Sequence, residues 1–148
     1  MHFVDRAAID AHLDAGEIVV ARPMALPTFN PEQYAIAHVA EHYLALVDYV
    51  LGAHPGYAPQ VLAQARDRRL YGCNMFVMPW PEFDRLCEFW FDCLFGLEAR
   101  VPVTRTGYHG RVFAFLSERI FDLHIRRLAD AGRRLVDYPI FCLDDGAF

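Results

Sequence analysis

Residues 72–94 read GCNMFVMPWPEFDRLCEFWFDCL, and this stretch decides the expected fold. Its first part, Cys73 to Met78, is a compact apolar run between Gly72 and a Pro-Trp-Pro sequence, which predicts a strand buried on both faces. Pro81 suits the first turn of a helix, and the aromatic-rich sequence after it predicts a helix to about Leu97. A buried strand followed directly by a long helix indicates an α/β class.

The flanking sequence adds mainly helices. The expected elements are a helix capped by Asp5 and ended by Gly16, a short buried strand at Ile18 to Ala21, a helix from Pro31 to Leu51 with Asn30 as its N-cap, a helix from Pro55, a helix from Arg111 to about Leu128, and a last short strand at Tyr138 to Leu143. The sequence therefore predicts a mainly helical α/β fold, with about four to five helices around a small sheet of two to four short strands.

The size and composition suit one folded unit with apolar surface to spare. The chain has 148 residues, so we expect residues 1–148 to form a single domain. Apolar residues make up 55% of the chain, above the usage of roughly 45–50% in typical soluble domains, so some of them are free to face a partner. The net charge of −5 argues against a nucleic-acid binder that works through general electrostatics.

The sequence His38-Val39-Ala40-Glu41-His42 fits the H-x-x-E-H pattern of some zinc peptidases. Such a site needs a third ligand and an open position for water, and the context of His54 or His109 supports neither as that ligand. Zinc hydrolysis is therefore a distant alternative, and the simpler interpretation is a helix that carries two histidines at its surface or at the edge of the core.

Other catalytic patterns are absent from the sequence. The four cysteines form no C-x-x-C pair, so the sequence suggests neither a zinc knuckle nor a thioredoxin-type site, and no G-x-S-x-G surrounds Ser117, the only serine. A P-loop and a G-x-G-x-x-G turn are also missing. The terminal pair Asp144-Asp145 is weak evidence for a metal site, and we expect no metal ligand in this chain.

A cationic cluster near the end of the sequence has two interpretations. Arg126, Arg127, Arg133 and Arg134 either form the solvated side of a helix, which we favour, or contact phosphate groups of a lipid-linked acceptor or of anionic lipids. The N-terminus has no apolar core typical of a signal peptide, and no run reaches the roughly 18 apolar residues of a transmembrane segment. We therefore expect a cytoplasmic protein, whose basic residues could touch the inner face of the membrane.

Several segments together resemble a known family. They are Tyr71-Gly72-Cys73-Asn74-Met75-Phe76-Val77-Met78, then Arg111-Val112-Phe113-Ala114-Phe115-Leu116-Ser117-Glu118-Arg119, and upstream the pairs Tyr34 with His38 and Pro55 with Tyr57. Over about residues 4–128 the chain resembles the C-terminal half of a family of bacterial capsular-polysaccharide and lipopolysaccharide glycosyltransferase-like domains, catalogued as a domain of unknown function. The family's N-terminal half, with its H-Y-R-R segment and the strands of the nucleotide-sugar side, has no counterpart here.

The resemblance implies the acceptor-side half of a GT-A-like glycosyltransferase of surface polysaccharide biosynthesis. A hexosyltransferase of this type needs a carboxylate for the acceptor hydroxyl and a site for the donor diphosphate, where related enzymes use a metal on a D-x-D pair that this chain lacks. Candidate catalytic residues are Glu118 and Asn74, each with an equally weighted structural alternative: Glu118 pairs with Arg111 or Arg119, and Asn74 braces the backbone. The candidates for substrate binding are Tyr34, His38, Trp80, His109 and Arg111.

The same resemblance leads to expectations about partners. No cofactor is expected in this chain, because a divalent metal with a nucleotide sugar would bind only in a complete enzyme. Strands that are interior in the complete fold would leave open edges here, so we expect a homo-oligomer or a separate donor-binding polypeptide, with a glycan or lipid-linked acceptor as ligand. The alternative from a different class is a non-catalytic binding or scaffold domain that has lost transferase activity.

Overall fold

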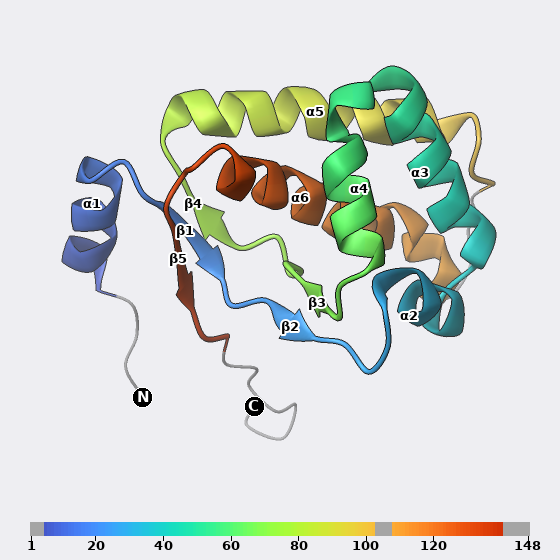
Figure 1. Cartoon of the computed structure of the whole chain (residues 1–148), viewed down its shortest axis with the longest axis horizontal. Coiled ribbons are helices and arrows are strands. Elements are labelled where there is room, and N and C mark those ends of the chain that lie inside the picture. Colours follow the sequence, from blue (N-terminus) through green and yellow to red (C-terminus); the bar gives the residue numbers. More distant parts are fainter. Residues whose placement is uncertain (1–4, 103–107, 141–148) are drawn as a thin grey trace.

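The structure is a computed structural model that describes residues 5–102 and 108–140, without the side chains of Tyr108 and His109. These residues form the expected mainly helical α/β fold (Figure 1). The helices are α1 (Arg6–Asp14), α2 (Asn30–Ala37), α3 (Ala40–Ala53), α4 (Ala58–Ala65), α5 (Trp80–Glu98) and α6 (Val112–Asp130), with 3-10 turns η1 (Pro55–Tyr57) and η2 (Tyr108–Arg111). The strands are β1 (Ile18–Ala21), β2 (Met24–Ala25), β3 (Arg69–Leu70), β4 (Phe76–Val77) and β5 (Leu135–Tyr138).

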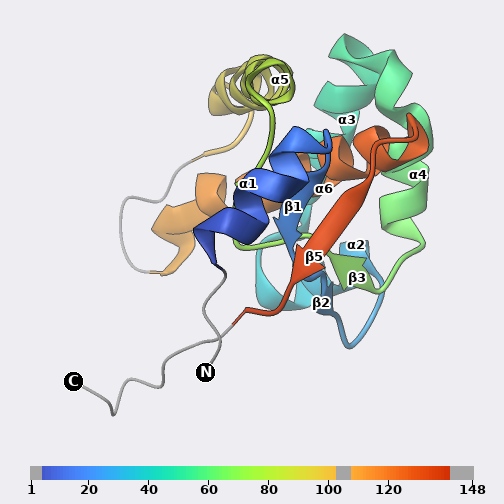
Figure 2. The same ribbon diagram turned by 90° about the vertical axis from the view of Figure 1, so that its left-hand side faces the viewer.

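The larger sheet has the strand order β4-β1-β5. Strand β1 runs antiparallel to β4 and parallel to β5, so that Val19 lies between Val77 and Val136. Side chains alternate across a strand, so Ile18 and Val20 share one face, where they pack in a cluster with residues of α5 and α6. Helix α1 lies beside β1 and β5 on the other face (Figure 2). The second sheet contains only the antiparallel pair β2 and β3.

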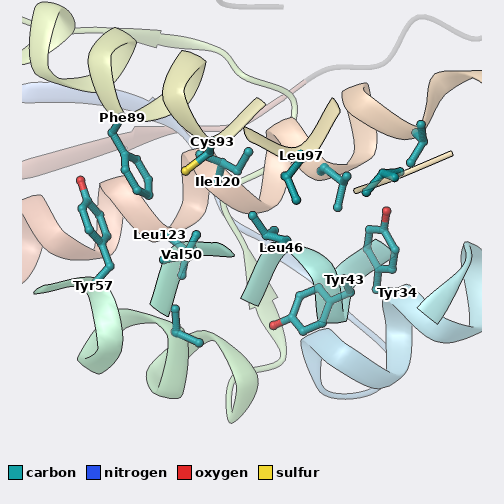
Figure 3. Packing of buried hydrophobic residues seen from close by; sticks show 14 residues of the cluster. Tyr34, Tyr43, Leu46, Val50, Tyr57, Phe89, Cys93, Leu97, Ile120 and Leu123 are labelled. Atoms are coloured by element: carbon teal, nitrogen blue, oxygen red, sulfur yellow. The ribbon is translucent and has the colours of Figure 1, made fainter. Parts of the chain in front are cut away.

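The main hydrophobic core lies between α3, α5 and α6 (Figure 3). The ring of Tyr57 stacks on Phe89 with centroids 3.9 Å apart, and Leu46, Val50 and Leu97 continue the core at 0–1% exposure. Helices α3 and α5 meet closely at Gly96, because a Cβ atom at this position would collide with the ring of Tyr49. A glycine at this helix position therefore allows the two helices to approach.

Four predicted elements are confirmed with nearly the expected bounds. Asp5 caps α1 by accepting a hydrogen bond of 3.2 Å from the backbone N–H of Ala7, and Gly16 follows the helix with φ of +70°. Strand β1 has the predicted limits, and the two long helices α5 and α6 begin and end within two residues of the expected positions. These elements have strong local patterns, namely caps, an apolar run and helical periodicity.

The helix predicted from Pro31 to Leu51 is wrong as a single element, because the chain leaves the helical conformation at His38 and Val39. His38 has φ −139° and ψ −160°, and its ring stacks against α6 instead of continuing the helix face. The new helix, α3, continues to Ala53, one residue beyond the glycine expected to close it. Asn30 is the first residue of α2 and not its cap, and its side chain is fully buried.

The strand predicted from Cys73 to Met78 is also wrong in length and burial. Only Phe76 and Val77 pair as β4, while Cys73 and Asn74 adopt left-handed conformations with φ of 63° and 48°. Asparagine tolerates this region better than most residues, and such a turn cannot continue a ladder. The last strand lies at Leu135–Tyr138 instead of Tyr138 to Leu143, and residues 141–148 are outside the described part. None of the described helices is long and apolar enough to cross a membrane.

Candidate functional site

Three of the predicted substrate-binding residues, Tyr34, His38 and Arg111, are brought together by Phe115. The rings of His38 and Phe115 stack with centroids 4.0 Å apart and an interplanar angle of 17°. The Tyr34 ring lies 4.7 Å from the His38 ring, and the guanidinium carbon of Arg111 lies 5.7 Å from the centre of Phe115. We call these four residues the aromatic stack.

The aromatic stack exists because of the break between α2 and α3. Tyr34 lies on α2, and His38 is the residue at which the chain leaves that helix. Arg111 and Phe115 are four positions apart at the start of α6, so they lie on the same face of that helix. At the end of α2, the ring of His38 lies on Phe115 of α6.

Glu118, the candidate catalytic carboxylate, follows Phe115 on α6. Residues three positions apart on a helix are neighbours, so Glu118 lies next to the aromatic stack. Its side chain is half-buried, and within residues 5–102 and 108–140 no side chain is found in a hydrogen bond or ion pair with it. Of the two pairing partners that we considered, Arg111 lies over Phe115, and Arg119 donates its hydrogen bonds to Asn30 and Gln33. Glu118 still interacts with the charge of Arg119, although no hydrogen bond joins the two side chains in the described part of the chain.

Arg119 anchors α6 to α2 in the interior, and its exposed fraction is only 3%. Its Nη1 donates a hydrogen bond of 2.6 Å to Oδ1 of Asn30, and its Nη2 donates to Gln33. The guanidinium carbon also lies 5.6 Å from the centre of the Tyr34 ring. Burial lowers the pKa of Arg119 from its ordinary value, although the nearby acidic groups oppose this shift. This anchor fixes the position of Tyr34 relative to the start of α6.

A buried polar network continues from Arg119 along α6. Gln64 donates to the backbone oxygen of Arg119 at 3.0 Å and to Asp122 at 2.8 Å, and it accepts from the hydroxyl of Tyr43 at 3.1 Å. Asp122 in turn accepts the backbone N–H of Tyr71 at 2.8 Å. Tyr71 begins the segment that carries Asn74, and its partner Asp122 lies one helical turn after Glu118 on α6. The sequence predicted none of this network; its only local trace is the polar series Arg119, Asp122 and Arg126 on one helix face.

Asn74, the second candidate catalytic residue, lines a pocket to which no residue of the aromatic stack belongs. It lines this apolar pocket of about 530 Å³ with β1, β4, Ile9 of α1, Tyr138 at the end of β5 and the two residues that follow it. Its Oδ1 atom is buried, and it has no hydrogen-bond partner within the described part of the chain. The structure thus shows an amide oxygen that faces mainly apolar side chains.

The remaining predicted residues do not join the aromatic stack. Trp80 begins α5 and is 73% exposed, with its ring 5.4 Å from that of Phe83. His109 lies in η2, but its side chain is outside the described part of the structure. Trp90 packs between the two core clusters and donates to the hydroxyl of Ser117 at 2.8 Å, which gives the only serine a structural contact.

The geometry that a zinc site requires is not formed. The H-x-x-E-H pattern needs both histidines on one helix, but His38 lies outside the helix that carries His42. In the two described ranges, no three His, Cys, Asp or Glu side chains gather in a way that could hold a metal ion.

The four arginines of the expected cationic cluster have different partners, although Arg127 and Arg133 line the same pocket. Arg126 pairs with Asp122 at 2.6 Å and with Asp67 at 3.1 Å, and its side chain is only 13% exposed. Arg127 lies over Tyr57, Arg133 pairs with Glu82, and Arg134 pairs with Glu17. The interpretation as one solvated basic surface fits Arg127 and Arg134, which are exposed, but not Arg126, which tertiary contacts hold in the interior.

Comparison with known proteins defines the class of the fold. The apo structure of the bifunctional glycosyltransferase WbbM matches this chain with a TM-score of 0.82 and 21% sequence identity, over 89% of this chain and 25% of that one. The described residues thus have the fold of part of a glycosyltransferase, and the chain spans about a quarter of the length of that protein. The chain belongs to the family described as Domain of unknown function (DUF4422), whose model matches residues 1–129. No curated protein sequence matches the chain.

Proposed function

We propose that this chain is the acceptor-side half of a glycosyltransferase of surface polysaccharide (capsule or lipopolysaccharide) biosynthesis. The observation that carries the proposal is the position of Glu118, a half-buried carboxylate beside the aromatic stack that interacts electrostatically with Arg119 and makes no hydrogen bond to it among the described residues. The shared fold with part of a glycosyltransferase supports the same function. The protein acts in the cytoplasm, at the inner face of the membrane where lipid-linked acceptors are assembled.

The half-buried rings of His38 and Phe115 offer the surface that a sugar ring prefers, and Tyr34, at 0% exposure, supports them from the core. The apolar face of a pyranose packs on aromatic rings, and its hydroxyl groups bind to polar groups at the edges of those rings. Glu118 then orients or deprotonates the attacking hydroxyl of the acceptor, and Arg111 binds its neighbouring oxygens. Asn74 and Trp80 lie apart from this surface, and in our proposal they and His109 contact other parts of a longer glycan chain.

The donor nucleotide sugar binds outside this chain in our proposal. The sequence has no D-x-D pair, and the three-stranded sheet has short edge strands at β4 and β5 in the described residues. Val77 on β4 and Met75 beside it are 37% and 46% exposed, so this edge offers apolar atoms to a further polypeptide. A separate donor-binding polypeptide docks at this edge and completes the divalent metal and diphosphate site, and a second copy of the chain is the alternative partner.

Calorimetric titration with a panel of nucleotide sugars, with and without manganese, tests the proposal. The chain alone should show no saturable binding, whereas the chain mixed with the polypeptide encoded next to it should bind one donor. The mixture should then transfer sugar to a lipid-linked acceptor, and Glu118→Gln should abolish the transfer. The matched control is Glu98→Gln, at an exposed position on α5.

Two results would contradict the proposal. Binding of a nucleotide sugar to the chain alone would place the donor site within it. Donor binding by the mixture with no transfer to any acceptor, and with equal behaviour of Glu118→Gln and wild type, would favour the non-catalytic scaffold.

A further inference from the structure

A second polar pocket lies away from the aromatic stack, between η1, the first turns of α5 and the end of α6. Its volume is about 360 Å³, which is enough for a small metabolite. Three arginines from different segments line it, Arg85 on α5, Arg127 on α6 and Arg133 in the turn after α6, together with Glu82 and His124. We call it the arginine pocket. Its three arginines and one glutamate give the lining a net charge of +2 with His124 neutral, whereas the whole chain has a net charge of −5.

Two buried atoms in this lining lack a hydrogen-bond partner among the described residues. They are Nε2 of His124, a residue that is 4% exposed, and Nε of Arg133. A buried polar group without a partner costs roughly 1–3 kcal/mol, so two of them beside one cavity favour a hydrogen-bonding ligand there.

One unpartnered atom is always a hydrogen-bond donor, because arginine Nε carries a hydrogen. The hydroxyl of Tyr57 lies 2.8 Å from Nδ1 of His124, and a phenol can donate to this nitrogen or accept from it. Burial lowers the pKa of His124 to about 4, so the ring is neutral and carries one hydrogen. A ligand that offers acceptors selects the tautomer with this hydrogen on Nε2, in which the phenol donates to Nδ1. Such a ligand satisfies both unpartnered atoms.

The charged groups of the pocket restrict the ligand further. Glu82 is held by Arg85 at 2.9 Å and by Arg133 at 3.2 Å, and Arg127 donates to the backbone oxygen of Gly56 at 2.9 Å. These contacts leave guanidinium N–H groups free to turn to an anion. Donors contributed by three segments can reach the three terminal oxygens of a phosphoryl group from different sides, whereas a carboxylate offers two coplanar oxygens.

We propose that the arginine pocket binds the phosphoryl group of a small phosphorylated metabolite, held by Nε2 of His124 and by Arg85, Arg127 and Arg133. This site is independent of the aromatic stack, since the two share no residue. The proposal therefore stands or falls separately from the glycosyltransferase function.

Titration of the intact chain with inorganic phosphate and with glycerol 1-phosphate tests this proposal, and acetate serves as the carboxylate probe. Phosphate and the phosphomonoester should bind with a stoichiometry of one, and acetate should bind at least ~10-fold more weakly. Arg133→Gln should weaken phosphate binding by ~10-fold or more, because it removes a charge-assisted hydrogen bond. The matched control is Arg134→Gln, which removes the same charge one residue later, where the partner is Glu17.

A spectroscopic readout separates a direct contact from a general charge effect. In long-range proton–nitrogen NMR spectra, phosphate should shift the Nε2 resonance of His124 along the same binding curve. If Arg133→Gln does not fold, Arg85→Gln replaces it, with Arg100→Gln as its control, since Arg100 pairs with Asp48 elsewhere. Absence of saturable binding, acetate affinity equal to that of phosphate, or equal losses in Arg133→Gln and Arg134→Gln would each overturn the proposal.

Discussion

Nη1 of Arg119 donates a hydrogen bond of 2.6 Å to Oδ1 of Asn30, across a sequence separation of 89 residues. Asn30 also donates from its Nδ2 to the backbone oxygens of Asp67 and Arg69, both at 3.0 Å. One fully buried amide thus connects α2, the segment before β3 and α6. The contact fixes Tyr34 beside the start of α6, which is what the aromatic stack requires.

Asn30→Ala should therefore destabilise the fold strongly. It leaves the buried guanidinium of Arg119 and two backbone oxygens with fewer partners, and the expected loss in free energy of unfolding is about 3 kcal/mol. Urea denaturation followed by circular dichroism measures it. Thr28→Ala, on the chain just before α2, is the control and should change stability by less than about 0.5 kcal/mol. A loss no larger in Asn30→Ala than in Thr28→Ala would show that the network does not stabilise the fold.

The two helix glycines Gly96 and Gly52 should respond in opposite ways to alanine. A Cβ atom at position 96 would collide with the ring of Tyr49, whereas a Cβ atom at position 52 meets nothing within 4 Å. Gly96→Ala should cost about 1–3 kcal/mol, and Gly52→Ala should be neutral or stabilise by up to about 1 kcal/mol. Thermal unfolding of the two variants measures the difference. Equal melting temperatures would contradict the close approach of α3 and α5.

Substitutions of Asn74 can separate its structural contribution from a functional one. Its φ of 48° is tolerated by glycine but disfavoured for alanine, so Asn74→Ala should cost about 1–2 kcal/mol and Asn74→Gly much less. If the amide binds substrate, Asn74→Gly should lose transfer activity in the reconstituted system while it keeps the stability of the wild type. Full transfer activity of Asn74→Gly would show that the amide does not bind substrate and that Asn74 contributes only to the stability of the fold.

The stability of the protein should fall as the solution is acidified, in part because of His124. Burial lowers its pKa from 6.5 to about 4, so below pH 6.5 the unfolded chain takes up a proton on this side chain that the folded chain does not. Between pH 7 and pH 4.5 this difference should lower the free energy of unfolding by about 2–3 kcal/mol. His124→Gln lacks this contribution, so urea denaturation at both pH values should show a smaller decrease for the variant. Equal decreases would show that His124 is not buried in its neutral form.

The sequence predicted those parts of the fold that have strong local patterns. The capped helix at Asp5, the apolar run of β1 and the periodic helices α5 and α6 need little tertiary information. The break at His38 carries no glycine or proline, so nothing local distinguishes it from a continuous helix. The left-handed pair Cys73 and Asn74 was equally hard to predict, because an apolar run alone does not report a turn.

The candidate site was predictable only in part, for a similar reason. Tyr34, His38, Arg111 and Glu118 were found from the family resemblance, and the structure places the first three in one stack with the fourth beside it. The buried network of Asn30, Arg119 and Asp122 and the arginine pocket depend on residues far apart in sequence. Only the fold brings them together, so no local spacing could predict them.

The most direct test of the central claim is one binding array that carries both nucleotide sugars and bacterial surface-glycan fragments, probed with the purified chain. We predict that the wild-type chain binds a subset of the glycans and none of the nucleotide sugars. His38→Ala should lose the glycan binding, because the aromatic stack that holds the sugar is broken. Retention of a nucleotide sugar by this chain, or glycan binding that is unchanged in His38→Ala, would contradict an acceptor site at the aromatic stack.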